Sequence, residues 1–312
     1  MAEPTVAAFL TEWLDSIAYS VRPRTWRRYS EYVDLHLIPE LGSTPLTTLS
    51  SRQIQGVYAD KIAGGLSTMS VLHIHSVLHR ALEQATRWGL IGVNPTDLVD
   101  APRPEPLEMN ALSPEEARNL LEAARGDRLE ALYALAVTTG MRQGELLGLR
   151  WRDVELEQRS VRVTTSLQYV PGKGLRLSPP KTARSRRHVL LSELAVGSLQ
   201  RHLKTQREEM LGALWEDNDL VFPNSRGRAM YATNLLSRSF ASLLRRAGLR
   251  HIRFHDLRHT AATLLLGEGV HPKVVSEMLG HSKTAITLDT YSHATPTMQR
   301  QAANAFDRLL GP

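Results

Sequence analysis

The sequence contains no cysteine among its 312 residues. This absence excludes disulfides, cysteine-ligated zinc fingers, iron–sulfur clusters and cysteine nucleophiles, and it favours a reducing compartment such as the cytoplasm. Long apolar runs are also missing, since none approaches the ~18 residues that a membrane-spanning helix needs. The first residues lack the basic start and the apolar stretch of a secretory signal. We therefore expect a cytoplasmic protein that does not contact a membrane.

Several widespread catalytic motifs are absent. The sequence has no G-x-x-x-x-G-K-[ST] phosphate-binding loop, no G-x-S-x-G nucleophile elbow and no strand-linked G-x-G-x-x-G turn. His255 and His259 have the spacing of zinc ligands on a helix, but the glutamate that zincins use as a general base is missing and Arg258 lies between them. We expect no metal and no cofactor.

Positive charge is present in moderate excess and is unevenly distributed. The net charge is +6, from 38 basic and 32 acidic residues. Residues 1–103 contain 9 basic and 10 acidic residues, so residues 104–312 carry the excess, a net +7. Hydrophobic residues make up 42% of the chain, which is typical of folded proteins.

A proline-rich segment divides the chain. Residues 101–111 (APRPEPLEMNA) hold three prolines and two acids, a composition that suits an extended linker. At roughly 100 to 200 residues per domain, the length also suits two domains. We predict an N-terminal domain over residues 1–103 and a second domain over residues 104–312.

The first domain is predicted to be helical. Apolar side chains recur at helical spacing within residues 6–17, 26–37 and 71–85. The last of these segments has a second face that carries polar and basic side chains and no acid, namely His73, Ser76, Arg80, Gln84 and Arg87. A solvent-exposed helix face is the simplest interpretation of this second stripe.

The second domain begins with helix signals. Ser113 to Glu116 form a capping box with proline at the first helical position, which predicts a helix as far as about residue 125. Further helices are expected over residues 129–137, ending before Gly140, and over residues 141–149.

The periodicity then changes to that of strands. Residues 161–167 alternate between apolar and polar, residues 171–174 are a turn signal, and residues 175–177 and 188–191 are further strand candidates. From Leu194 the pattern is helical to the end, including an amphipathic tail over residues 296–312. The fold class is therefore mainly α with one small antiparallel β-sheet.

Cations, imidazoles and one phenol follow a particular order in the second domain. The segments are TGMRQGELLGLRW at 139–151, PKT at 180–182, His255-x-x-Arg258, LGHS at 279–282 and Tyr291. This order and content resemble the tyrosine recombinase (phage integrase) family, and the resemblance covers nearly the whole chain. It implies a helical core-binding domain followed by a mixed α/β catalytic domain.

The resemblance implies the chemistry of the reaction. Tyr291 matches the nucleophile that attacks a DNA phosphate and becomes joined to its 3′ side. Arg142 and Arg258 match the paired guanidinium clamp on the non-bridging oxygens. These residue types suit phosphoryl transfer, which requires alignment and stabilisation of charge on the equatorial oxygens and which two arginines and imidazole donors can support without a metal.

Further positions match supporting roles. His255 and His281 match the two histidines of the family, and Glu145 is similar to the acid that orients the first arginine. Lys181 falls where a hairpin lysine protonates the departing 5′ oxygen. This assignment competes with nearby Lys173 and with three neighbouring arginines, Arg184, Arg186 and Arg187.

Each residue also has a purely structural interpretation when it is taken alone. Arg142 could be a surface residue paired with Glu145, and Lys181 a solvated loop residue. A single histidine is more often a buried, hydrogen-bonded imidazole, and Tyr291 alone would more often be a half-buried core residue. The occurrence of all six residues in family order favours the joint interpretation.

Double-stranded DNA with specific recombination sites is the implied partner. On the first domain, the candidate contacts to a major groove are Thr68, His73, Arg80, Gln84 and Arg87. The resemblance also implies a homotetramer in the synapse, held through the tail over residues 296–312, with an excisionase or a host DNA-bending factor as further partners. Action at the nucleoid of the bacterial cytoplasm is expected.

Two alternative functions and one question of domain content remain open at the level of sequence. A type IB topoisomerase uses the same phosphotyrosine chemistry to relax DNA, and a catalytically silent relative would bind DNA only. Many such integrases also carry an arm-binding domain before the core-binding domain, and here only a handful of residues precede the first expected helix. A two-domain enzyme and a shortened chain both fit that observation.

Overall fold

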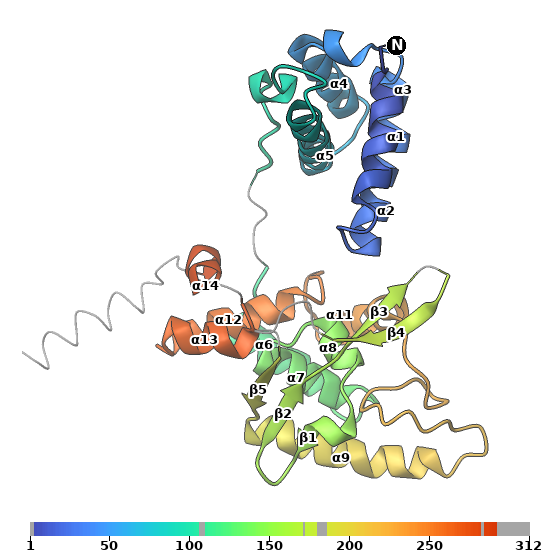
Figure 1. Ribbon diagram of the computed structural model, residues 1–312. Coiled ribbons are helices and arrows are strands. Elements are labelled where there is room, and N and C mark those ends of the chain that lie inside the picture. The colour runs from blue at the N-terminus through green and yellow to red at the C-terminus, as the bar shows by residue number, and fades with distance from the viewer. Residues whose placement is uncertain (1–2, 106–109, 171, 180–185, 282–283, 292–312) are drawn as a thin grey trace, which may run out of the picture. The chain divides into compact units, whose positions relative to one another are not determined.

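The computed structural model describes residues 3–105, 110–170, 172–179, 186–281 and 284–291. The chain forms two compact units, Met1–Leu107 and Glu108–Pro312 (Figure 1). Residues 101–105 form no helix or strand. The tail helix predicted over residues 296–312 lies outside the described residues. Within the described part of the chain, every helix is too short or too polar to cross a bilayer.

The first unit is helical, as predicted. Its helices are α1 (Val6–Ile17), α2 (Pro23–Tyr32), α3 (Ile38–Leu41), α4 (Ser51–Ala63) and α5 (Thr68–Arg87), with a π-helical segment at Val33–Leu37 and 3₁₀ turns at Leu46–Thr48 and Pro95–Leu98. Local capping explains where the longer helices begin: Ser50 and Gln53 form a capping box at α4, and the Ser67 side chain caps α5. The helix expected over residues 26–37 changes to π geometry after Tyr32.

The two faces of α5 separate as the sequence predicts. The apolar stripe is fully buried in the core of the unit and consists of Val71, Ile74, Leu78, Leu82 and Ala85. On the opposite face, His73, Arg80 and Arg87 are exposed and Gln84 is half-buried. Burial of the apolar stripe therefore determines which side chains of α5 face solvent.

The second unit is mainly helical. Its helices are α6 (Pro114–Ala123), α7 (Glu130–Thr139), α8 (Gln143–Leu147), α9 (Glu193–Met210), α10 (Ala232–Asn234), α11 (Ala241–Arg246), α12 (Asp256–Gly267), α13 (Pro272–Leu279) and α14 (Thr284–Tyr291), with a π-helical segment at Leu235–Phe240 and a 3₁₀ turn at Trp151–Asp153. The predicted capping box at Ser113 and Glu116 is present at α6. α7 is apolar on nearly all sides and packs against α9 and α12, at the centre of the core.

Two predicted helices extend further than the observed helices. The helix expected over residues 141–149 covers only Gln143–Leu147, because Arg142 has an extended backbone and caps it. Residues 211–231, expected to be helical, form turns between α9 and α10 that include an isolated bridge between Arg150 and Leu220. Pro223 and the left-handed conformations of Asp219 and Gly227 interrupt helical geometry there.

The predicted fold class, mainly α with small antiparallel β structure, is confirmed, but the strands form two sheets and not one. One sheet has the antiparallel order β1 (Val154–Glu155), β2 (Ser160–Val163) and β5 (Arg187–Leu190), and the other is the hairpin of β3 (Ser166–Val170) and β4 (Gly174–Ser178). The expected strand over residues 161–167 breaks at two threonines. The Thr164 hydroxyl donates to the Asp153 carboxylate (3.0 Å) and the Thr165 hydroxyl donates to the Gly148 carbonyl (2.7 Å). These side-chain bonds accompany the switch of the chain from one sheet to the other.

Candidate active site

The turn that ends α7 creates the site. Gly140 has a left-handed backbone (φ 59°) and stops α7. A Cβ at Gly140 would clash with the Leu279 side chain, and together with the left-handed backbone this favours glycine at the position. The chain then leaves the turn in extended conformation at Arg142 and enters α8, which places the Arg142 side chain at the start of that helix.

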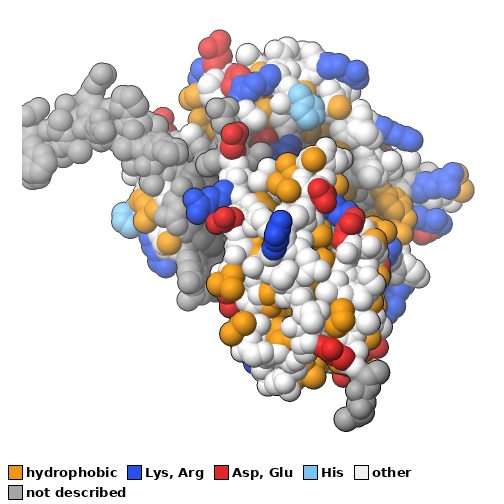
Figure 2. All heavy atoms as spheres, turned by 90° about the horizontal axis from the view of Figure 1, so that it is seen from above, with side chains coloured by type: hydrophobic (Ala, Val, Ile, Leu, Met, Phe, Trp, Pro, Cys, Tyr) orange, Lys and Arg blue, Asp and Glu red, His pale blue; other side chains and the backbone are white. Residues whose placement is uncertain are grey.

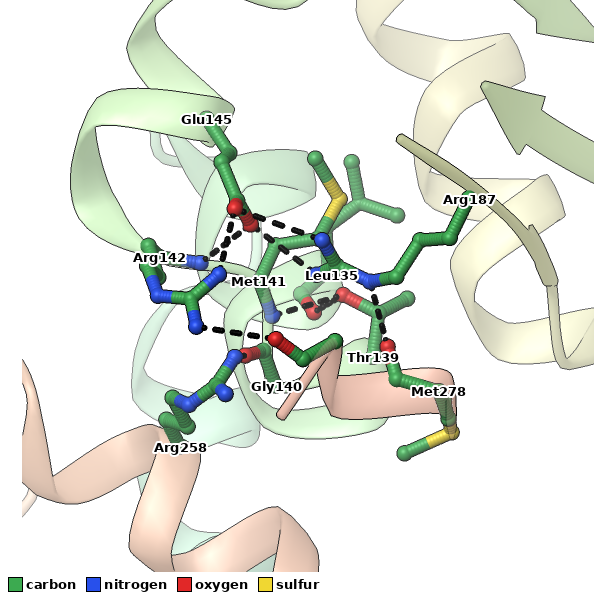
Figure 3. A network of polar contacts seen from close by, with 10 residues as sticks. Leu135, Thr139, Gly140, Met141, Arg142, Glu145, Arg187, Arg258 and Met278 are labelled. Carbon is green, nitrogen blue, oxygen red and sulfur yellow. Dashed lines mark hydrogen bonds and ion pairs between the residues drawn. The ribbon is translucent and has the colours of Figure 1, made fainter. Parts of the chain in front are cut away.

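Glu145 is the anionic centre of the site. It is 3% exposed and accepts hydrogen bonds from the Arg142 backbone N–H (2.9 Å) and from Arg142 Nη1 (2.8 Å). Its two carboxylate oxygens also accept from Arg187 Nη1 (3.2 Å) and Nη2 (2.9 Å) (Figure 3). Burial alone would raise the pKa of Glu145, but the hydrogen bonds and charges of Arg187 and Arg142 outweigh it and hold this pKa below its ordinary value.

The two predicted clamp arginines meet at this turn. Arg258, on α12, is 3% exposed and donates from Nη1 to the Gly140 carbonyl (2.8 Å), which is 118 residues away in sequence. Arg142 donates from Nη2 to the Gly280 carbonyl (3.2 Å) and keeps 39% of its side chain exposed. Figure 3 shows both guanidinium groups on the same side of the Gly140 turn. Backbone carbonyls therefore hold both guanidinium groups at one place.

Neutral imidazoles accompany the arginines. Burial, followed by the charges of Arg258, Arg142 and Arg187, lowers the pKa of His281 to about 4. Partial loss of water contact, followed by the charges of the neighbouring His259 and Arg258, lowers the pKa of His255 to about 4, although the residue as a whole is exposed. The His255 and His259 rings lie 5.0 Å apart. Both predicted histidines are therefore neutral at neutral pH and lie within electrostatic range of Arg258.

His281 is linked to the helix that carries the predicted nucleophile. The Nδ1 atom of His281 lies 2.8 Å from Thr287 Oγ1, within hydrogen-bonding distance, and Thr287 is fully buried in α14. α14 packs against α12 and α13 and ends at Tyr291. The side chain of Tyr291 and the whole of Lys181 lie outside the described residues, so both roles stay predictions.

Arg187 is a member of the site that the sequence motifs do not single out. In the sequence it is only one of three arginines near Lys181, yet its side chain is 6% exposed and reaches Glu145. The available signal was its position directly before the alternating residues 188–191, at the edge of a strand. His259 is also close to the site, although its spacing from His255 indicated no more than an unlikely zinc ligand.

The five candidate DNA contacts of the first unit lie along α5. Arg80 donates to the Tyr29 hydroxyl (3.1 Å) with its guanidinium carbon 5.6 Å from the ring centre, and the His73 ring lies 6.2 Å from that of Tyr32. Arg87 pairs with Glu83 one turn earlier (3.1 Å), while Thr68 and Gln84 are half-buried. On the face seen in Figure 2, acidic side chains are interspersed with lysines and arginines, so that face is not uniformly cationic.

Comparison with known proteins identifies the relatives of the chain. The profile of the "Phage integrase family" matches residues 110–298, and that of the "Phage integrase, N-terminal SAM-like domain" matches residues 5–62. The "Tyrosine recombinase XerC-like" protein of Caldanaerobacter subterraneus subsp. tengcongensis is 33% identical over 326 residues, which cover 98% of this chain and 82% of the relative. An integrase of Streptomyces ambofaciens is 33% identical over 298 residues, with coverage of 92% and 76%.

Solved structures share the fold. The Tn1549 transposon integrase in complex with a circular intermediate DNA has a TM-score of 0.84 at 22% identity and covers 97% of this chain and 99% of its own. A lambda integrase dimer bound to a COC′ core site has a TM-score of 0.68 at 20% identity, with coverage of 94% and 97%. With a family profile that spans more than half of its length and a relative one third identical over nearly all of it, the chain belongs to the phage integrase family of tyrosine recombinases.

Proposed function

We propose that this chain is a site-specific DNA recombinase that cleaves and rejoins DNA through a 3′-phosphotyrosyl intermediate. The observation that carries the proposal is the meeting of Arg142, Arg258 and neutral His281 at the turns of Gly140 and Gly280. Arg142 is accessible to a ligand, whereas Arg258 lies where little water competes and its charge acts through a lower dielectric. Two guanidinium groups so placed suit the non-bridging oxygens of one phosphodiester.

In each step of the proposed reaction, one residue transfers the proton and others stabilise the developing charge. The Tyr291 hydroxyl loses its proton as its oxygen bonds to phosphorus, and the bond from phosphorus to the 5′ oxygen breaks. We assign the tyrosine proton to His255, whose imidazole is uncharged at neutral pH and so has a nitrogen lone pair to accept it, while Lys181 donates a proton to the departing 5′ oxygen. Arg142 and Arg258 stabilise the charge that develops on the phosphate.

The energy of the broken diester is retained in the protein–DNA bond. A phosphotyrosyl ester is of the same chemical class as the phosphodiester that it replaces, so a 5′ hydroxyl from the same or another strand can reverse the step. The reaction therefore requires no nucleotide hydrolysis, which agrees with the absence of a phosphate-binding loop from the sequence.

Recombination also requires DNA binding and assembly. We propose that the exposed face of α5 and the second unit both contact the recombination site, and that four copies assemble on DNA through residues 296–312. The resemblance to integrases supports this proposal, among them a lambda integrase tetramer solved on a Holliday junction. Deletion of residues 297–312 is expected to leave the monomer folded and to impair recombination. Full recombination by the deleted protein would contradict the assembly proposal. An excisionase or a host bending factor would act as a further partner at the nucleoid.

Covalent trapping tests the chemistry. The probe is a nicked suicide duplex whose sequence is selected from a randomised pool by capture with the wild-type protein. Wild type should become joined to the 3′ phosphate, and Tyr291→Phe should not, because it lacks the attacking oxygen. Tyr231→Phe removes a hydroxyl from an exposed tyrosine of the same unit and is the matched control. Capture by Tyr291→Phe would overturn the proposal, and relaxation of supercoils without paired sites would favour a topoisomerase.

A further inference from the structure

Arg187 uses its guanidinium group to join three segments of the site. Its two terminal nitrogens donate to the Glu145 carboxylate, and its Nε donates to the Met278 carbonyl (2.6 Å) near the end of α13. Figure 3 shows Arg187 approaching Glu145 from the side opposite to Arg142. A single side chain from the start of β5 thus links the start of α8 to the end of α13.

Arg187 also packs directly against Gly280. A Cβ at Gly280 would lie 3.1 Å from Arg187 Nη1 and 3.2 Å from its Cδ, and the backbone there is left-handed (φ 69°). The Gly280 carbonyl in turn accepts from Arg142 Nη2, and His281 is the next residue. The backbone that orients His281 is therefore held between the two arginines.

The burial of this pair distinguishes it from an ordinary structural ion pair. Arg187 and Glu145 are 6% and 3% exposed, whereas Arg128 and Glu209, a two-pronged pair in the same unit, are 29% and 27% exposed. Removing charges from water is costly, and a buried pair contributes less to stability than its contacts indicate. In some proteins such pairs are retained because they specify one conformation, and here both partners touch residues of the site.

We propose that Arg187 is a positioning residue for strand cleavage, which holds Glu145 and the Gly280 turn so that Arg142 and His281 address the same phosphate. This inference rests on the proposed function. Without Arg187, the Glu145 carboxylate has Arg142 as its only guanidinium partner among the contacts described, and the end of α13 loses its tie to β5. Arg142 and His281 then lose their common orientation, although neither residue has been changed.

Single-turnover cleavage of the captured suicide duplex tests the role, with DNA affinity measured separately. Arg187→Ala should lower the cleavage rate at saturating DNA on the order of 10²-fold, the cost of a small misplacement of catalytic groups, while its DNA dissociation constant stays within about threefold. Arg187→Lys keeps the cation but lacks the planar fork, so it should recover only part of the rate. Arg187→Lys also tests the positioning role if Arg187→Ala does not fold.

The pH dependence of cleavage separates positioning from general stability. His281 faces Arg142 on α8, Arg187 on β5, Arg258 and His259 on α12, and Thr287 on α14. Removal of Arg187 takes away one of the charges that lower the pKa of His281, so this pKa rises and the acid limb of the rate profile moves to higher pH. Arg128→Gln breaks the comparable pair away from the site and should lower the melting temperature without moving that limb.

The outcomes distinguish failure of the positioning role of Arg187 from failure of the proposed function. If wild type captures no duplex, the proposed function fails. If wild type captures DNA and Arg187→Ala cleaves at the wild-type rate, the positioning role is overturned and the function stands. The positioning role is likewise overturned if Arg187→Ala and Arg187→Lys lose only melting temperature, as Arg128→Gln does, or if their loss lies entirely in DNA affinity.

Discussion

The cations at the Gly140 turn and those on the exposed face of α5 are held in opposite ways. Around the turn, Arg258 and Arg187 are almost completely buried and Arg142 keeps 39% of its side chain exposed, and carbonyls and one carboxylate fix the orientation of all three. On α5, Arg80 and Arg87 are exposed and rest on a tyrosine and on a surface glutamate. Orientation by buried acceptors suits chemistry at one phosphate, whereas exposed cations can adapt to a duplex. The proposed function thus assigns arginine two purposes that differ in burial.

The strongest way to break this comparison is to remove the buried arginine of α12. Arg258→Ala should lower the single-turnover cleavage rate on the order of 10³-fold or more, the usual worth of an arginine that stabilises phosphoryl-transfer charge. Arg258→Lys should remain well below wild type because it cannot present two parallel donors. Far-ultraviolet circular dichroism controls for folding. Cleavage by a folded Arg258→Ala protein within tenfold of wild type would contradict the assignment.

The turn itself can be tested through stability. Gly140→Ala combines a left-handed backbone with a clash against Leu279 and should lower the free energy of unfolding by about 3 kcal/mol. Gly126→Ala is the matched control, because Gly126 also has positive φ (72°) but nothing within 4 Å of the added Cβ. It should cost only about 1 kcal/mol. Equal effects in urea unfolding would show that the packing at Gly140 is unimportant.

The site histidines predict a loss of stability in acid. The folded pKa of His255 and of His281 is about 4, below the ordinary value of 6.5, so the unfolded chain binds more protons between these pH values. Stability is therefore complete above pH ~6.5 and declines as pH falls towards ~4. Because His255 is exposed and solvent screens its charge, most of the decline comes from His281, and the melting temperature should drop by roughly 5 °C across this interval. His281→Asn should flatten the decline, and an unchanged slope would contradict the neutral state of His281.

The smallest expected effect belongs to the exposed face. Arg80→Ala should weaken DNA binding only severalfold and reduce the dependence of log affinity on log salt by about one unit, as expected for one lost phosphate contact. Its cleavage rate at saturating DNA should equal that of wild type. Arg125→Ala removes an exposed arginine of the second unit and is the control. A slope unchanged by Arg80→Ala would remove α5 from the DNA interface.

Local signals made much of the fold predictable. The capping box at Ser113, the stop at Gly140 and the buried stripe of α5 each depend on residues a few positions apart, and all three are present. The break at Thr164 and Thr165 was not predictable, because the alternation continues through it. The two threonine hydroxyls donate hydrogen bonds to Asp153 and to the Gly148 carbonyl, which folding brings close to them.

The same distinction applies to the site. Motifs in the sequence predict Arg142, Arg258 and His281 as site residues, and the structure brings them together. The motifs do not single out Arg187, because Arg184 and Arg186 are identical to it in kind and its contact with Glu145, 42 residues away, forms only on folding. Sequence order shows which residue types a reaction needs. It does not show which of several equal side chains folding buries.

The contact between His281 and Thr287 couples the orientation of the histidine to the packing of α14. The contact of Nδ1 with the Thr287 hydroxyl orients the imidazole ring of His281 relative to α14. The Thr287 hydroxyl belongs to α14, the helix that ends at Tyr291. Packing of α14 against the unit therefore also orients the His281 imidazole. Under the proposed function, displacement of α14 would remove the Tyr291 nucleophile and the alignment of His281 together.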